Sequence, residues 1–153
     1  MLQVFIVAFI IALDQLTKYL AKTRLKPVGS VPLIQNIFHF TYVENRGAAF
    51  GILQNQRWLF IALTVVVSVA IAYYLFTHRQ ESTLLTVALS MILGGAIGNL
   101  IDRIRLGYVV DMLHFVLIDY PVFNVADSFV VIGTILLAYY ILFLADSGQK
   151  LFG

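Results

Sequence analysis

The chain has 153 residues, of which 61% are hydrophobic and 12% are charged, and its mean hydropathy is +0.92. About a quarter of the residues of a soluble domain are charged, so this composition excludes an ordinary soluble protein and indicates a membrane protein. The net charge of +2 is too small to indicate a nucleic-acid partner, and the lack of cysteine excludes disulfides, thiolate nucleophiles and cysteine metal sites.

The first predicted element is a membrane-spanning helix over residues of about 2–21. Residues 1–13 carry no charged side chain, and Asp14 and Lys18 follow before the apolar pattern ends. No Lys or Arg precedes the apolar run and no suitable small-x-small cleavage site follows it, which favours a retained span over a secretory signal peptide. Asp14 and Lys18 are four residues apart and therefore share one helix face, where they can pair.

Residues of about 22–57 form a long link in which we expect a small β-sheet at the bilayer surface. The run from Ile37 to Val43 is rich in β-branched and aromatic residues, which favour a strand, and Asn45 and Gly47 then interrupt it. The Asn45 amide could bind the backbone of another chain. The small residues Gly47, Ala48 and Ala49 would leave space for that bound chain. Ordinary turn chemistry is an equally simple explanation of Asn-x-Gly.

Two further spans are predicted over residues of about 58–77 and 83–101. Trp58 to Thr77 and Ser82 to Ile101 are each 20 residues long without an acidic or basic side chain, which is enough to cross the hydrocarbon core as a helix. The link between them is short and can only be a turn. The two long links therefore lie together on the opposite face, and chemistry is expected there.

The third span ends in the sequence GGAIGNLIDR. Gly94 and Gly98 form a GxxxG pair, which predicts the close approach of a neighbouring helix. Asn99 and Asp102 are three residues apart and share one helix face, and Arg103 follows them. These three polar residues either support a site or cap the helix.

The second long link, residues of about 102–124, contains two aspartates in different settings. Asp111 follows a strand-like run around Tyr108 to Val110, and nothing in its local sequence requires a carboxylate. Asp119 precedes Tyr120 and a proline, which is the pattern of a solvated turn. Asp111 is therefore the better candidate for a functional residue.

The last span is predicted over residues of about 125–144, because Ser128 to Ala145 is free of acidic and basic side chains. Asn124 is suited to cap this helix, and Asp127 stands three residues later, as in a capping box. Asp127 taken alone could be only a cap. Its occurrence together with Asp111 favours a functional role.

Two carboxylates that meet at a partly dry interface cannot both ionise easily, so one pKa rises and the pair shares a proton. This is the arrangement of an aspartic protease, which needs no metal or cofactor. The histidines show no ligand spacing, and HExxH, GxSG and GxGD motifs are absent from the sequence. Asp111 and Asp127 are therefore the predicted catalytic pair, with no metal and no cofactor expected.

Two other classes of protein also remain open at this stage. A small proton-coupled transporter would use Asp14, Asp102, Asp111 and Asp127 as a relay, and a membrane scaffold would explain the GxxxG packing. A relay predicts acids in the middle of the spans, whereas these acids cluster near span ends on one side. The clustering favours a catalyst at the membrane interface.

The distribution of basic residues does not support an extracytoplasmic position for the long links. Eight cations fall on the side that holds those links, against Arg79 and Lys150 on the other side. The positive-inside rule would place the long links in the cytoplasm.

The ordered motifs of the chain resemble those of bacterial signal peptidase II, the lipoprotein signal peptidase family. They are DQLTK at residues 14–18, ENRGAAF at 44–50, GGAIGNLIDR at 94–103, GYVVDM at 107–112 and FNVAD at 123–127. Together they cover nearly the whole chain and are highly specific. Met112 departs from the pattern, because the family usually has Phe after the first catalytic Asp.

The resemblance implies a mainly α, polytopic enzyme of the bacterial inner or plasma membrane, with 1–153 as a single membrane domain. Four transmembrane helices, a small extracytoplasmic β-sheet and a short interfacial helix or lid are expected, with both termini cytoplasmic. The implied activity is an aspartyl endopeptidase that cleaves prolipoproteins before a diacylglyceryl-modified cysteine, in contact with membrane lipid and without nucleic acid. Asp111 and Asp127 match the family's catalytic pair. The residues expected to bind substrate or support the site are Asp14, Lys18, Asn45, Gly47, Asn99, Asp102, Arg103 and Asn124.

Overall fold

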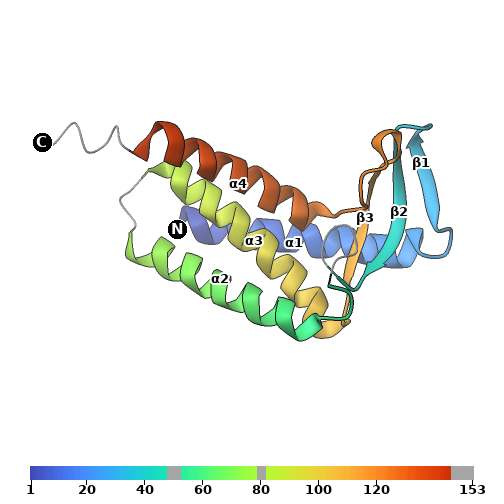
Figure 1. The fold of residues 1–153 in the computed structure, drawn as a ribbon, viewed down its shortest axis with the longest axis horizontal. Coiled ribbons are helices and arrows are strands. Elements are labelled where there is room, and N and C mark those ends of the chain that lie inside the picture. The colour runs from blue at the N-terminus through green and yellow to red at the C-terminus, as the bar shows by residue number, and fades with distance from the viewer. Residues whose placement is uncertain (48–52, 79–81, 146–153) are drawn as a thin grey trace, which may run out of the picture.

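The computed structural model describes residues 1–47, 53–78 and 82–145 and contains four long apolar helices (Figure 1). The helices are α1 Leu2–Leu20, continued by a π-helical turn Ala21–Leu25, α2 Arg57–Thr77, α3 Thr83–Arg105 and α4 Val125–Phe143. Each is long and apolar enough to cross a membrane. The predicted mainly helical, multi-pass membrane fold is confirmed.

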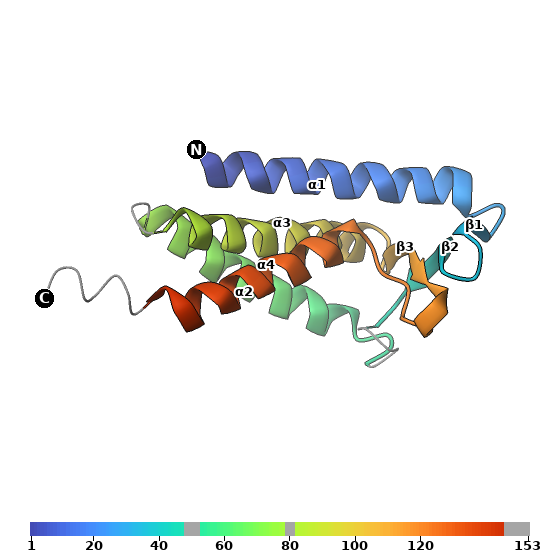
Figure 2. The same cartoon turned by 90° about the horizontal axis from the view of Figure 1, so that it is seen from above.

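Helix α3 is the central element of the bundle and packs against each of the other three spanning helices (Figure 2). Glycines on two of its faces make the close approach of α1 and α4 possible. Gly94 and Gly98 lie against Ile10 and Asp14 of α1, and a Cβ at Gly98 would stand 2.6 Å from Asp14 Oδ2. Gly95 faces α4, where a Cβ would collide with the carbonyl oxygen of Ala126. The predicted close helix packing is therefore present, between α3 and both α1 and α4.

A three-stranded antiparallel sheet lies beyond one end of the helices (Figure 1). Its strands are β1 Ser30–Ile34, β2 Phe38–Asn45 and β3 Val109–Phe115, in the order β1-β2-β3. Strand β2 pairs with β3 from Phe38 opposite Phe115 to Asn45 opposite Val109, and a 3-10 turn, Val116–Ile118, follows. This register joins the two long links of the chain at the same edge of the molecule.

The sheet is fixed to the helices by a small apolar core. Ala21 and Leu25 at the end of α1 pack with Val110 and Met112 of β3, and all four side chains are buried. Successive strand residues point to opposite faces, so Asp111 points away from this core. Burial of Val110 and Met112 thus determines the direction in which the Asp111 carboxyl group projects.

Three elements differ from the sequence prediction. Helix α3 continues to Arg105 and does not end near residue 101, β1 was not predicted, and β3 extends to Phe115. In the first long link, Ala48 and Ala49 lie outside the described residues, as does part of the expected lid. The N-terminus and the end of α4 lie at the end of the bundle opposite the sheet (Figure 1).

Candidate active site

Asp111 lies in the middle of β3 and is almost fully buried, with 1% of its surface exposed. Its Oδ1 accepts a hydrogen bond from Asn124 Nδ2 at 2.6 Å, and its Oδ2 accepts one from Asn45 Nδ2 at 3.0 Å. Burial, and then the nearby charge of Asp127, raise the pKa of Asp111 to about 7, although both amides favour the ionised form. This carboxyl group can therefore carry a proton near neutral pH.

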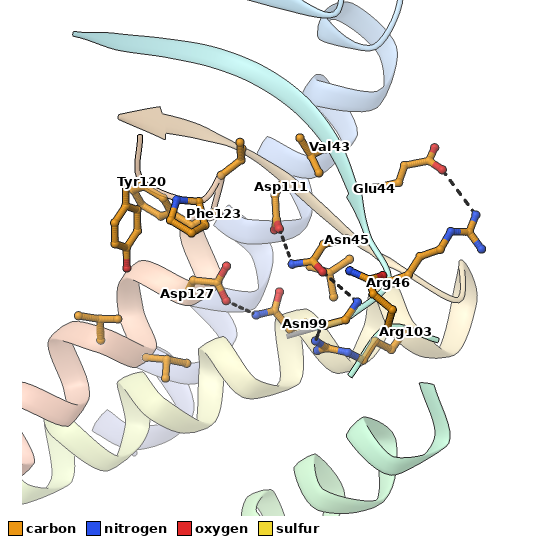
Figure 3. Close-up of a pocket in the computed structure, with 17 residues that line it drawn as sticks. Val43, Glu44, Asn45, Arg46, Asn99, Arg103, Asp111, Tyr120, Phe123 and Asp127 are labelled. Atoms are coloured by element: carbon orange, nitrogen blue, oxygen red, sulfur yellow. Dashed lines mark hydrogen bonds and ion pairs between the residues drawn. The ribbon is translucent and has the colours of Figure 1, made fainter. Parts of the chain in front are cut away.

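Asp127 is held at the first turn of α4 by a complete capping box, as the sequence predicts. The Asp127 N–H donates to Asn124 Oδ1 at 2.9 Å, and the Asn124 N–H donates to Asp127 Oδ2 at 3.2 Å. The other oxygen, Oδ1, accepts from Asn99 Nδ2 at 2.7 Å (Figure 3). The carboxylate is thus fixed from two elements, α4 and α3.

The orientation of the Asn99 and Asn124 amides is dictated by their partners. Asn99 Oδ1 lies 2.8 Å from Lys18 Nζ, which can only donate, so Asn99 Nδ2 is left to face Asp127. Asn124 Oδ1 is likewise occupied by the Asp127 N–H, so its Nδ2 faces Asp111 and also donates to Asn99 Oδ1 at 3.1 Å. Both amides therefore present N–H groups to the two carboxylates.

A buried charge cluster lies beneath these amides. Lys18 Nζ is 2.9 Å from Asp14 Oδ2, as the spacing predicts, and 3.4 Å from Asp102 Oδ2. The two acids also accept backbone N–H groups, Asp14 from Ala126 and Asp102 from Val110, both at 3.0 Å. The cluster connects α1 and α3 to the residues that precede Asp127 and Asp111.

Gln15 belongs to this cluster, and sequence analysis assigned no role to it. Its Nε2 lies within 3.3 Å of Asp14 Oδ2, 3.2 Å of the Gly98 carbonyl oxygen and 3.1 Å of Asp102 Oδ1. Its position beside Asp14 in the DQLTK motif is the one feature of the sequence that could have indicated a role for Gln15. No spacing rule connects residue 15 to residues 98 and 102.

Asp111 and Asp127 line the same cavity of about 640 Å³ (Figure 3). Asn45, Gly47, Asn99 and Arg103 line it as well. The Gly47 N–H donates to Asn45 Oδ1 at 3.0 Å, and Arg103 Nη2 lies 3.4 Å from the Gly47 carbonyl oxygen. The other walls are mostly apolar and include Tyr120, Pro121, Phe123, Val130 and Val131.

The structure brings together the ten residues that the sequence selected. Six of them line the cavity, including Asp111 and Asp127. Asn124 forms hydrogen bonds to both of these carboxylates. Asp14, Lys18 and Asp102 lie in the charge cluster. Asp119, predicted to be a turn residue, is exposed and in the left-handed conformation, with φ 48°. Within the described ranges, no three His, Asp or Glu side chains are grouped so as to hold a metal ion.

Comparisons with known proteins identify the family. Residues 6–143 match the family model described as signal peptidase (SPase) II. The lipoprotein signal peptidase of Caldanaerobacter subterraneus is 57% identical over 138 residues, which are 90% of this chain and 94% of that protein. The lipoprotein signal peptidase of Clostridioides difficile is 49% identical and covers 97% of this chain and all of its own length.

The fold also matches a solved structure. A bacterial membrane enzyme superimposes with a TM-score of 0.85 at 35% identity, over 97% of this chain and 90% of that one. The similarity thus extends over all four helices and the sheet. The chain is a multi-pass membrane peptidase that belongs to the signal peptidase II family.

Proposed function

We propose that the protein is an aspartyl endopeptidase that removes the signal peptide from prolipoproteins by cleaving before a diacylglyceryl-modified cysteine. The observation that carries the proposal is that Asp111 and Asp127, from two separate elements, line one cavity and are both bound by Asn124. The names of the relatives supply the class of substrate.

In the proposed mechanism the two carboxyl groups share one proton before substrate binds. The ionised member accepts a proton from a water molecule as the water oxygen attacks the scissile carbonyl carbon. The protonated member donates to the carbonyl oxygen. Collapse of the tetrahedral intermediate breaks the C–N bond, the amine leaves with a proton from the pair, and the signal peptide departs with a new carboxyl group.

The surrounding amides support this chemistry because each carboxylate oxygen accepts one N–H group and keeps a second lone pair. Asn45 and Asn124 hold Asp111, and Asn99 holds Asp127. We assign Asp14, Lys18 and Asp102 to positioning these elements. We assign Gly47 and Arg103, which line the cavity, to contact with the bound peptide.

The proposed substrate is attached to the bilayer, and one side of the cavity suits such a substrate. Val130 and Val131 of α4 form part of its wall, and Val131 is 53% exposed on the surface of the spanning helix. We therefore propose that acyl chains enter from the bilayer beside α4. The chain acts as one membrane domain in the bacterial inner or plasma membrane. Its sheet is extracytoplasmic and both termini are cytoplasmic. The link 22–57 lies over the bound peptide as a lid.

The decisive experiment is cleavage of a diacylglyceryl-modified precursor peptide by the purified protein in detergent. Asp111→Asn and Asp127→Asn should each reduce the rate about a thousandfold or more, because each removes one member of the acid-base pair. The matched control is Asp119→Asn, which removes an exposed carboxyl group from the same link and should leave the rate nearly unchanged. Wild-type cleavage by either variant of the pair would exclude the proposed mechanism.

The structure does not favour the transporter alternative. Asp14 and Asp102 are tied by hydrogen bonds to the start of α4 and to β3, so the acids form one layer near the sheet. A relay across the bilayer requires acids at successive depths. No such second layer of acids occurs in the described part of the helices.

A further inference from the structure

A second cavity, of about 190 Å³, lies on the other side of β3 from the candidate active site. Val110 lines this second cavity, whereas its neighbour Asp111 lines the first, as expected for successive residues of a strand. The remaining walls come from the ends of α1 and α3, which run side by side to the sheet (Figure 2). The polar side chains in its lining are Gln15, Lys18, Tyr19, Lys22, Asp102 and Arg105.

The charges of this cavity are unevenly paired. Lys18 and Asp102 belong to the buried cluster, and both Asp102 oxygens already accept hydrogen bonds, from Gln15 and from the Val110 N–H. Lys22 and Arg105, by contrast, form no ion pair or side-chain hydrogen bond among the residues that the structure describes. Two cations that have no partner in the described part of the chain therefore line the same cavity.

The position of this cavity matches the depth of lipid headgroups. Lys22 follows α1 and Arg105 ends α3, so both stand where the spanning segments leave the hydrocarbon core. No residue from the described parts of α2 and α4 lines the cavity, and Arg105 in its lining is exposed, so the cavity opens at the protein surface between α1 and α3. Tyr19, 63% exposed beside it, is a typical side chain of the membrane interface.

Attraction between a helix C-terminus and a cation explains why Lys22 and Arg105 are favourable where they are. It does not explain why two helices direct them into the same cavity. Basic pockets between transmembrane helices bind anionic headgroups, and a phosphodiester supplies acceptor oxygens to both Lys and Arg. We propose that this cavity binds an anionic phospholipid, with the headgroup phosphate between Lys22 and Arg105.

The inference is independent of the proposed catalytic pair. Native mass spectrometry of the detergent-solubilised full chain would measure retention of phosphatidylglycerol against phosphatidylcholine with identical acyl chains. The wild type should prefer the anionic lipid about tenfold or more, since each cation adds attraction for it. Asp111→Asn should show the same preference, so loss of cleavage and loss of lipid binding can be told apart.

The double variant Lys22→Gln/Arg105→Gln should lose the preference, while Lys22→Arg/Arg105→Lys should keep it. Arg24→Gln is the matched control, because Arg24 has the same charge on the same turn but lines a different, apolar groove. Thermal unfolding in detergent checks that each variant is folded. If the double variant does not fold, Arg105→Gln replaces it, because this substitution alters only an exposed side chain.

Three results would overturn the proposal. The first is an unchanged lipid preference in the folded double variant or in Arg105→Gln. The second is an equal loss of preference in Arg24→Gln, which would indicate only diffuse attraction between charges. The third is displacement of the lipid by inorganic phosphate at matched concentration. The last result would mark a site for soluble anions.

Discussion

Asn124 is the side chain through which the two candidate catalytic groups are positioned together. Its Nδ2 binds Asp111, its Oδ1 binds the Asp127 N–H, and its own N–H binds the Asp127 carboxylate. A helix cap thus also fixes the geometry of a carboxylate pair. Its complete burial leaves no water to replace these bonds.

The pKa of Asp111, about 7 against an ordinary 3.8, predicts a pH dependence of stability. Between about pH 4 and 7 the folded protein binds more protons at this position than the unfolded chain, so the contribution of Asp111 to stability falls as pH rises through that window. Asp111→Asn does not titrate. Relative to wild type it should gain roughly 2 to 4 kcal/mol in the free energy of unfolding between pH 4 and 8.

Unfolding by SDS in mixed micelles at several pH values would measure this difference. The control Asp119→Asn shows how much of the gain in the free energy of unfolding comes merely from removing a carboxyl group from the link 102–124. A difference between wild type and Asp111→Asn that is the same at pH 4 and pH 8 would contradict the prediction.

For single residues, sequence spacing predicts the contacts made within one helical turn and not those made across the fold. The Asp14 and Lys18 pair and the Asn124 and Asp127 cap follow from fixed helical geometry. The hydrogen bond between Asn45 and Asp111 joins residues 66 positions apart. Its existence depends on the register of β2 against β3, which no local pattern encodes.

Among the elements, α3 positions the site because it contacts α4 without side chains between the backbones. A Cβ at Gly95 would collide with the Ala126 carbonyl oxygen and lie 2.7 Å from Val130 Cγ2. Asn99 stands one turn further along α3 and binds Asp127. The distance between the two helices therefore sets the length of that hydrogen bond.

Gly95→Ala should force α3 and α4 apart, lower stability by about 1 to 3 kcal/mol and reduce cleavage at least tenfold. Thermal unfolding in detergent and the peptide cleavage assay would measure the two effects. Ala70→Val adds more volume at an exposed position of α2 and should change neither quantity appreciably. Normal cleavage by Gly95→Ala would show that the helices can adjust without moving Asn99.

Three of the four spans were predictable because long runs of uncharged residues are unambiguous in a membrane protein, whereas the first was inferred although Asp14 and Lys18 lie within it. The end of α3 was not predictable, because Asp102, Arg103 and Arg105 interrupt the apolar run while the helix continues. Strand β1 was also missed. It contains Pro32 and is exposed along its whole length, so it shows no alternation of buried and exposed residues.

For the whole molecule, part of the excess of cations near the sheet has a local explanation that is independent of topology. Lys18 is paired with two acids, Lys26 lies 2.7 Å from Glu44, and Arg57 Nη2 donates to the Ile104 carbonyl oxygen at 2.7 Å. Cations retained by such contacts are weak indicators of the cytoplasmic side. These contacts weaken the positive-inside count as evidence for a cytoplasmic sheet.

Cysteine labelling in intact cells tests this orientation at a single chosen position of the chain, because the sequence contains no other cysteine. Leu33→Cys, exposed on β1, should react with a membrane-impermeant maleimide. His78→Cys, exposed at the opposite end of the bundle, should react only after lysis. The reverse pattern would place the candidate active site in the cytoplasm.

The division of the carboxylate pair between β3 and the last spanning helix has a consequence for biosynthesis. Asp127 is among the last acidic residues to leave the ribosome, and Asp111 acquires its Asn124 partner only when α4 starts to form. On the proposed function, a nascent chain with three inserted helices has no protease activity. Proteolysis begins only when the last helix has entered the membrane, so a partly assembled chain cannot cleave other proteins.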